Sequence, residues 1–160
     1  TENSGPKSAI SDSFTGRAGV ICDKDDSAPD ALKMVEQVAE HLEMNLLYMD
    51  AEGHDIHTAY ISHISHITSY ALANTVLEKE REEDTIFQLA SSGFSSTVRL
   101  AKSHPEMWVP IFRQNKENVL DVLNEHITQL RKFKSALEKD NYEYLEELIR
   151  NANKIRGILR

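Results

Sequence analysis

Residues 116–159 read KENVLDVLNEHITQLRKFKSALEKDNYEYLEELIRNANKIRGIL, and this stretch sets the fold class. Its apolar side chains recur at the spacing of one face of an α-helix. Two helices are expected, over 115–139 and after Asn141, whose side chain can cap the second. Their apolar faces carry Leu120, Leu123, Ile127, Leu130 and Leu137, with Lys134 as the exception, and Leu145, Leu148, Ala152, Ile155 and Leu159. The pattern predicts an αα-hairpin, and its spacing fits an intrachain core and a partner chain equally well.

The region from 51 to 114 also predicts helices and no strand. Asp50 can cap a long helix that runs to about Leu77. Shorter helices are expected at 85–90 and 96–102, with a turn at 91–94. Another helix is expected to start at Pro105 and to bend or restart at Pro110. The buried face of the long helix is expected to hold Ile56, Ala59, Ile67, Tyr70 and Ala71.

The first fifty residues have a different character. Ala18 to Cys22 is a short apolar run that predicts a buried strand, and 46–49 predicts a second one. Between them, Ser27 with Asp30 resembles a capping box that opens a helix. We therefore expect a strand–helix–strand unit over 1–50 and an all-helical domain over 51–160, which gives a mainly α protein.

Composition and charge exclude several classes of protein. The 160 residues carry 26 acidic and 18 basic side chains, a formal net charge of −8, which argues against nucleic acid as a partner. No apolar run approaches the roughly 20 residues that cross a bilayer. Cys22 is the single cysteine, so no internal disulfide can form, and we expect a cytoplasmic protein. The chain starts at Thr1 without an initiator Met, which we interpret as a start inside a longer protein.

Four histidines lie within residues 54–66, namely His54, His57, His63 and His66. Histidine titrates near neutral pH, so such a run is a candidate site. A metal site is disfavoured, because the two i, i+3 pairs start on opposite sides of a helix and no cysteine or Glu-x-x-His motif accompanies them. We expect no metal, a structural role for His63 and an exposed His57.

Four blocks of sequence, in order and at matching spacing, together resemble the prephenate dehydrogenase family. They are Thr1-Glu2-Asn3-Ser4-Gly5; His54-Asp55 with Ser62-His63-Ile64-Ser65-His66; Gly93-Phe94 with Thr97-Val98-Arg99-Leu100-Ala101; and Pro105-Glu106-Met107-Trp108 with Ile111-Phe112 and Asn115-Lys116. The family oxidises prephenate with NAD⁺, with loss of CO₂, to 4-hydroxyphenylpyruvate in tyrosine biosynthesis. The resemblance implies that 1–50 is the tail of a Rossmann-type NAD-binding domain and that 51–160 is a helical, homodimer-forming domain that binds prephenate.

The resemblance also implies roles for particular residues. Arg99 corresponds to the arginine that grips a substrate carboxylate, and its planar guanidinium suits that task. His66 is expected near the substrate side chain, with Ser62 one helical turn earlier. The remaining candidates for the substrate site are His54, Glu2 and Trp108.

The nucleotide fingerprint of the family is missing from this chain. Glycines occur at positions 5, 16, 19, 53, 93 and 157, so no G-x-G-x-x-G motif follows a strand. The catalytic histidine of the family is expected just upstream of Thr1. We therefore expect that NAD is bound mainly outside this chain and that the chain alone does not turn over prephenate.

Three departures from the family pattern concern substrate choice. Ser65 replaces a proline, Ser92 a glycine, and Ser95 a lysine found in many members. They leave open arogenate, the amino analogue, as the substrate. A helical dimerisation module without chemistry, which binds tyrosine, is the alternative from another class, and tyrosine is also a candidate inhibitor of the enzyme.

Overall fold

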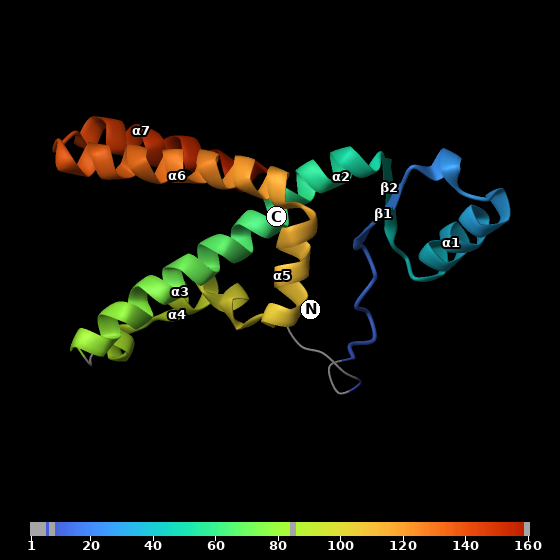
Figure 1. Ribbon diagram of the computed structural model, residues 1–160, viewed down its shortest axis with the longest axis horizontal. Coiled ribbons are helices and arrows are strands. Elements are labelled where there is room, and N and C mark those ends of the chain that lie inside the picture. Colours follow the sequence, from blue (N-terminus) through green and yellow to red (C-terminus); the bar gives the residue numbers. More distant parts are fainter. Residues whose placement is uncertain (1–5, 7–8, 84–85, 159–160) are drawn as a thin grey trace.

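The computed structural model describes residues 6, 9–83 and 86–158, and it is mainly helical (Figure 1). A small two-stranded sheet with one helix lies at one end of the molecule. The remaining helices form a branched unit, in which α3 (Ile64–Glu83) diverges from the hairpin of α6 (Lys116–Glu138) and α7 (Tyr142–Ala152). The predicted class, a mainly α protein preceded by a short strand unit, is confirmed. Glu2 lies outside the described residues.

The strand–helix–strand unit forms as predicted. Strands β1 (Ala18–Cys22) and β2 (Asn45–Met49) pair in parallel, with Ala18 opposite Asn45. A parallel pair needs a crossover connection, and α1 (Pro29–His41) supplies it. The predicted capping box at Ser27 is wrong: a 3₁₀ turn, η2 (Lys24–Asp26), comes first, the Ser27 N–H bonds its Lys24 carbonyl at 3.1 Å, and Ala28 takes the cap position.

One continuous helical segment carries the four histidines. It consists of α2 (Ala51–Thr58), one π-helical turn η3 (Ala59–His63) and α3, and we call it the histidine helix. The predicted cap is confirmed, because the Asp50 carboxylate accepts the Gly53 N–H at 2.6 Å. The helix continues beyond the predicted end at Leu77 to Glu83.

The predicted buried face of the histidine helix is partly correct. Ala59 is buried and Ile67 and Tyr70 are half-buried, but Ile56 is 38% exposed and Ala71 is also exposed. The buried positions after Ala59 are polar, namely His63, His66 and Ser69. A prediction that assigns 100° of helical rotation to each residue fails here for two reasons. The buried side chains are polar and have hydrogen-bond partners. In addition, the π turn contains an extra residue, which shifts the facing direction of every residue after it.

Short helices connect the histidine helix to α6. They are η4 (Ile86–Leu89), α4 (Ser92–Thr97), η5 (Arg99–Lys102) and α5 (Pro105–Gln114). The predicted turn at 91–94 is wrong, because α4 begins at Ser92, and the predicted single helix at 96–102 is broken at Val98. Pro105 starts α5 as predicted, but α5 continues through Pro110 without restarting.

The αα-hairpin is confirmed by α6, α7 and the terminal 3₁₀ turn η6 (Asn153–Gly157). The Asn141 side chain caps α7 by accepting the Tyr144 N–H at 3.1 Å. Asp140 turns the chain with φ 51°. On α6 the buried residues are Val119, Val122 and Ala136, whereas Leu120, Leu130 and Leu137 of the predicted stripe are 42%, 55% and 56% exposed. Most of that stripe is therefore not intrachain core.

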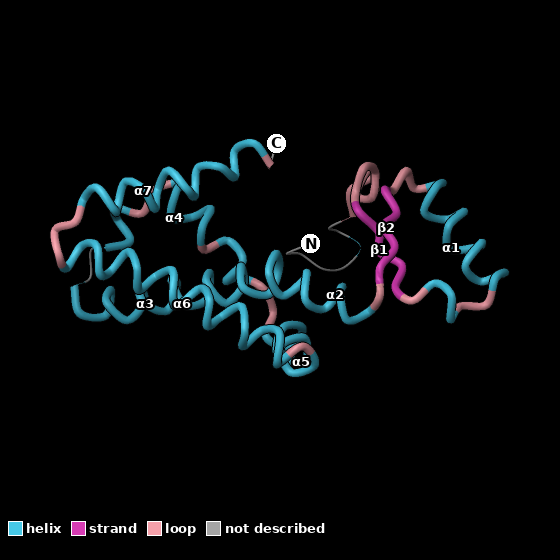
Figure 2. The backbone as a smooth tube through the Cα atoms, turned by 90° about the horizontal axis from the view of Figure 1, so that it is seen from above, coloured by secondary structure: helices cyan, strands magenta, loops and turns pink. Residues whose placement is uncertain are grey.

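Figure 2 shows the strands and α1 beyond α2, away from the helical region that follows. Within that region, the Thr68 hydroxyl of α3 and His126 Nε2 of α6 lie 3.2 Å apart and tie the two helices together. None of the described helices has the length and apolar character needed to span a bilayer.

Candidate functional site

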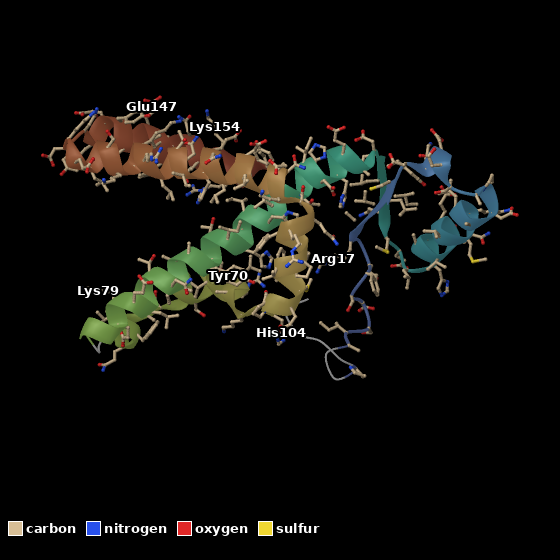
Figure 3. All side chains as sticks on the ribbon, in the orientation of Figure 1. Arg17, Tyr70, Lys79, His104, Glu147 and Lys154 are labelled. Carbon is tan, nitrogen blue, oxygen red and sulfur yellow. The ribbon has the colours of Figure 1, made fainter. Side chains whose placement is uncertain are left out.

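The histidine helix and α5 meet in a group of four rings, three of them buried and that of Phe112 half-buried. His63 and His66 come from the histidine helix, and Trp108 and Phe112 come from α5. We call this group the imidazole–aromatic cluster. The His63 ring lies edge-on to Trp108 and Phe112, with ring centroids 6.0 and 6.3 Å away. Trp108, His63 and His66 are 7%, 8% and 9% exposed, so the cluster is a packed layer rather than a row of surface side chains. In Figure 3, the labelled Tyr70 on α3 and His104, just before α5, help the reader to find the two helices that contribute these rings.

His66 is held rigidly in this cluster. Its ring stacks on Trp108, with centroids 3.4 Å apart and planes 28° from parallel. Its Nδ1 lies 3.0 Å from the Ser62 carbonyl oxygen. A carbonyl can only accept, so Nδ1 carries the hydrogen and donates it. The other ring nitrogen, Nε2, is then the atom that can receive a proton or bind a ligand.

Asn115 fixes the opposite tautomer in His63. The Asn115 Nδ2 donates to the Asp55 carbonyl at 2.7 Å, which identifies it as the amide nitrogen. The same Nδ2 lies 3.3 Å from His63 Nδ1, so that ring nitrogen must accept. Asn118 Nδ2 donates to the Asn115 Oδ1 at 2.8 Å and completes the network. His63 is therefore bound in its neutral form.

The electrostatics of His63 agree with this arrangement. Burial lowers the pKa of His63 below its usual 6.5, the nearby Asp55 carboxylate opposes that change, and the charges of His66 and His54 reinforce it. Burial penalises the imidazolium, and protonation of Nδ1 would also remove the acceptor that Asn115 needs. The cluster therefore favours neutral His63.

We expect the free energy of unfolding to fall as the pH drops below about 6.5. The unfolded chain then binds a proton at His63 that the folded chain resists, so this contribution is complete above the unfolded pKa and is lost through the lower folded pKa. Urea denaturation at pH 7.5, 6.5 and 5.5 measures it. His63→Asn places an amide oxygen near the position of Nδ1 and cannot titrate, so its stability should depend less on pH. An equal pH dependence in both proteins would contradict the assignment.

The structure also places the other described candidate residues. Ser62 is half-buried in the π turn, and its carbonyl orients His66. His54 lies in the first turn of α2 and pairs with Asp55 at 3.1 Å. Arg99 is the exposed first residue of η5. Among the candidates, His66 therefore contacts both Ser62 and Trp108.

Sequence reasoning missed two buried polar residues that organise this region. Asn115 occurs in a block that resembles the family, but its bonds to α2 and His63 could not be read from that match. Ser69, 1% exposed, gives no periodic or motif signal. Ser69 could have been identified only by noticing that a polar residue occupies a helix position that faces the core.

The described connection between β1 and α1 is acidic and contains no glycine-rich turn. In such folds the pyrophosphate binds at a glycine-rich turn between the first strand and its helix. Here the connection after β1 contains Asp23, Asp25 and Asp26 and no glycine. Their charges would repel a pyrophosphate. The described histidine, cysteine and acidic side chains also form no group of three or more that could hold a metal ion.

Comparison with known proteins gives a consistent result. Residues 50–151 match the family described as prephenate dehydrogenase, dimerization domain. The chain is 27% identical over 161 residues to a cyclohexadienyl dehydrogenase of Zymomonas mobilis, covering 100% of this chain and 55% of the relative. It is 28% identical over 126 residues to a prephenate dehydrogenase of Bacillus subtilis, covering 79% and 34%. The chain thus spans about a third to a half of these relatives.

Solved structures share the fold. Prephenate dehydrogenase from Aquifex aeolicus, in complex with hydroxyphenyl propionate and NAD⁺, superposes with a TM-score of 0.89 and 28% identity, over 100% of this chain and 56% of that one. Arogenate dehydrogenase from Synechocystis superposes with a TM-score of 0.75 and 22% identity, over 93% and 54% of the two chains. The second likeness concerns the fold alone.

Proposed function

Since this chain belongs to the prephenate dehydrogenase family, through residues 50–151, we propose that it forms the substrate-binding and dimer-forming part of an NAD-dependent prephenate dehydrogenase. The full enzyme would convert prephenate to 4-hydroxyphenylpyruvate and CO₂, with NAD⁺ as the oxidant. The acidic connection after β1 does not suit a pyrophosphate, which supports a role of this chain on the substrate side. The hydroxyphenyl propionate bound by the Aquifex relative supports an aromatic carboxylate as the ligand class.

The proposal depends on one observation: His66 has a fixed orientation, and only one of its ring nitrogens is available to a ligand. Trp108 stacking and the Ser62 carbonyl fix the ring, so Nε2 has a defined position and role before a ligand arrives. A preorganised imidazole can accept a hydrogen bond when neutral and can donate to a carboxylate when protonated. Ser62 acts by orienting this ring, while His54 and Glu2 are proposed as residues at the edge of the same site.

Arg99 is proposed to bind a carboxylate of the substrate. In the full-length protein, Arg99→Ala is expected to raise KM for prephenate about 10- to 100-fold, with a smaller change in kcat. The reason is that a charge-assisted hydrogen bond contributes about 1.5–3 kcal/mol, and each 1.4 kcal/mol is tenfold. Steady-state NAD⁺ reduction measures it. Arg113→Ala, which removes another exposed arginine, is the control, and an unchanged KM in Arg99→Ala would remove Arg99 from the site.

Substrate choice is tested by the same assay. Prephenate and arogenate differ at the side chain, which is a keto acid in one and an amino acid in the other, so kcat/KM for the two substrates reports the preference directly. We propose prephenate as the better substrate. Binding of tyrosine in the absence of any turnover of either substrate would favour a module without chemistry.

We also propose that the chain forms a homodimer through its helices. Apolar side chains on α6, α7, η6 and the residue that follows η6 are exposed, and the exposed set includes Leu130, Leu137, Ile149, Ile155 and Ile158. Exposed apolar side chains of this kind fit an interface with a partner chain.

A further inference from the structure

Ser69 is completely buried and bonds a segment far from it in sequence. It lies on α3, one helical turn after His66, and is 1% exposed. Its hydroxyl donates to the Thr97 carbonyl at 3.0 Å and accepts the Ala101 N–H at 3.1 Å. These two backbone groups stand on either side of Arg99.

The position of this hydroxyl explains why the helix breaks at Val98. Thr97 C=O and Ala101 N–H are four residues apart, so they are the pair that would bond each other in a continuous α-helix. Ser69 Oγ bonds both partners instead. A side chain inserted into the helical ladder is a known cause of a break. On either side of it, α4 ends at Thr97 and the 3₁₀ turn η5 begins at Arg99.

Other bonds show that the break is well defined. The Val98 N–H bonds the Phe94 carbonyl at 3.0 Å and so closes α4, while the Ala101 N–H also bonds the Val98 carbonyl at 3.0 Å in the tighter 3₁₀ pattern. Arg99 therefore leaves the backbone from a 3₁₀ turn. In a continuous α-helix its side chain would point in a different direction, because the rotation per residue differs.

We propose that Ser69 is a positioning residue for the substrate: its hydroxyl keeps the 97–101 segment open and so sets the direction of the Arg99 guanidinium. This inference rests on the proposed carboxylate-binding role of Arg99. Without the hydroxyl, Thr97 and Ala101 are free to bond each other and continue α4. Ser69 then affects ligand binding only through Arg99.

A double-mutant cycle in the full-length protein tests whether Ser69 positions Arg99. KM and kcat for prephenate are measured for wild type, Ser69→Ala, Arg99→Ala and the double variant. We expect Ser69→Ala to raise KM about tenfold in the wild-type background, with little change in kcat, and less than about twofold in the Arg99→Ala background. Ser69→Thr keeps the hydroxyl and should restore part of the affinity. Thr75→Ala removes a hydroxyl that bonds only its own helix, to the Ala71 carbonyl, and should leave KM unchanged.

The outcomes separate this inference from the proposed function. If Arg99→Ala raises KM but Ser69→Ala does not, the positioning role is overturned and the function stands. Equal effects of Ser69→Ala in both backgrounds would also overturn it, since a general structural role acts independently of Arg99. If Arg99→Ala leaves KM unchanged, the proposed role of Arg99 fails and the positioning role fails with it. The unfolding temperature of each variant verifies that it is folded at the assay temperature.

Discussion

Trp108→Ala is expected to lower the free energy of unfolding by about 3–5 kcal/mol, the usual cost of removing a large buried aromatic side chain. Trp108 is 7% exposed and contacts three rings, those of His63, His66 and Phe112. Its loss leaves a cavity beside two imidazoles and removes the surface on which His66 stacks. Urea denaturation followed by circular dichroism measures the effect, because Trp108 is the only tryptophan and its fluorescence is lost in the variant.

The neighbouring Met107 provides a matched control. It lies on the same helix but is 56% exposed, so Met107→Ala should change the free energy of unfolding by less than about 1 kcal/mol. Both variants are compared at one protein concentration, because assembly contributes to the stability of an oligomer. A loss below about 1 kcal/mol for Trp108→Ala would show that the imidazole–aromatic cluster does not stabilise the fold.

Replacing Leu130 and Leu137 together by glutamate is expected to convert the proposed homodimer to a monomer. The two side chains are 55% and 56% exposed in the single chain and lie seven residues apart on one face of α6. Burying a leucine contributes about 1.5–3 kcal/mol, so losing two weakens association by at least about 3 kcal/mol, or more than about 100-fold. The added carboxylates would also have to be desolvated. Sedimentation velocity at micromolar concentration measures the change.

Arg131→Glu controls for charge. It also changes the net charge by two units, on an exposed residue next to Leu130, but it removes no apolar contact. We expect this variant to remain dimeric. A wild-type protein that sediments as a monomer would contradict the dimer itself, whereas a dimeric double variant would move the interface away from this face.

Local patterns predicted the elements whose cause is local. The strand at Ala18–Cys22, the cap at Asp50, the start of α5 at Pro105 and the cap at Asn141 all appear in the structure. Each depends on groups within a few residues of one another. The predictions at Ser27 and at 91–94 failed although the same rules were applied, because neighbouring segments formed competing short turns and helices.

The buried face of the histidine helix could not be read from periodicity. Apolar spacing selected Ile56 and Ala71, which are exposed, and passed over His63 and His66, which are buried. A polar side chain can be buried when a partner satisfies it. The partner of His63 is Asn115, 52 residues away, so a window of the length used to read helical periodicity cannot contain both.

For the candidate site as well, the sequence identified residues but not their arrangement. The resemblance drew attention to Arg99, His66, Ser62 and Trp108, and His66 contacts Ser62 and Trp108 in the structure. It did not predict how they are oriented. The tautomers of the two imidazoles and the break beside Arg99 depend on Ser62, Asn115 and Ser69, which act through hydrogen bonds to particular backbone or ring atoms.

Sequence patterns are enough to predict that this protein is mainly helical, which family it belongs to, and where most of its helices start. These properties come from side-chain patterns and short-range capping, which operate along the chain. Only in the folded protein is His66 buried against Trp108, His63 held neutral by Asn115, and the helix broken at Val98 by Ser69. Those features come from contacts across 28 to 52 residues, and such contacts exist only after the helices have packed.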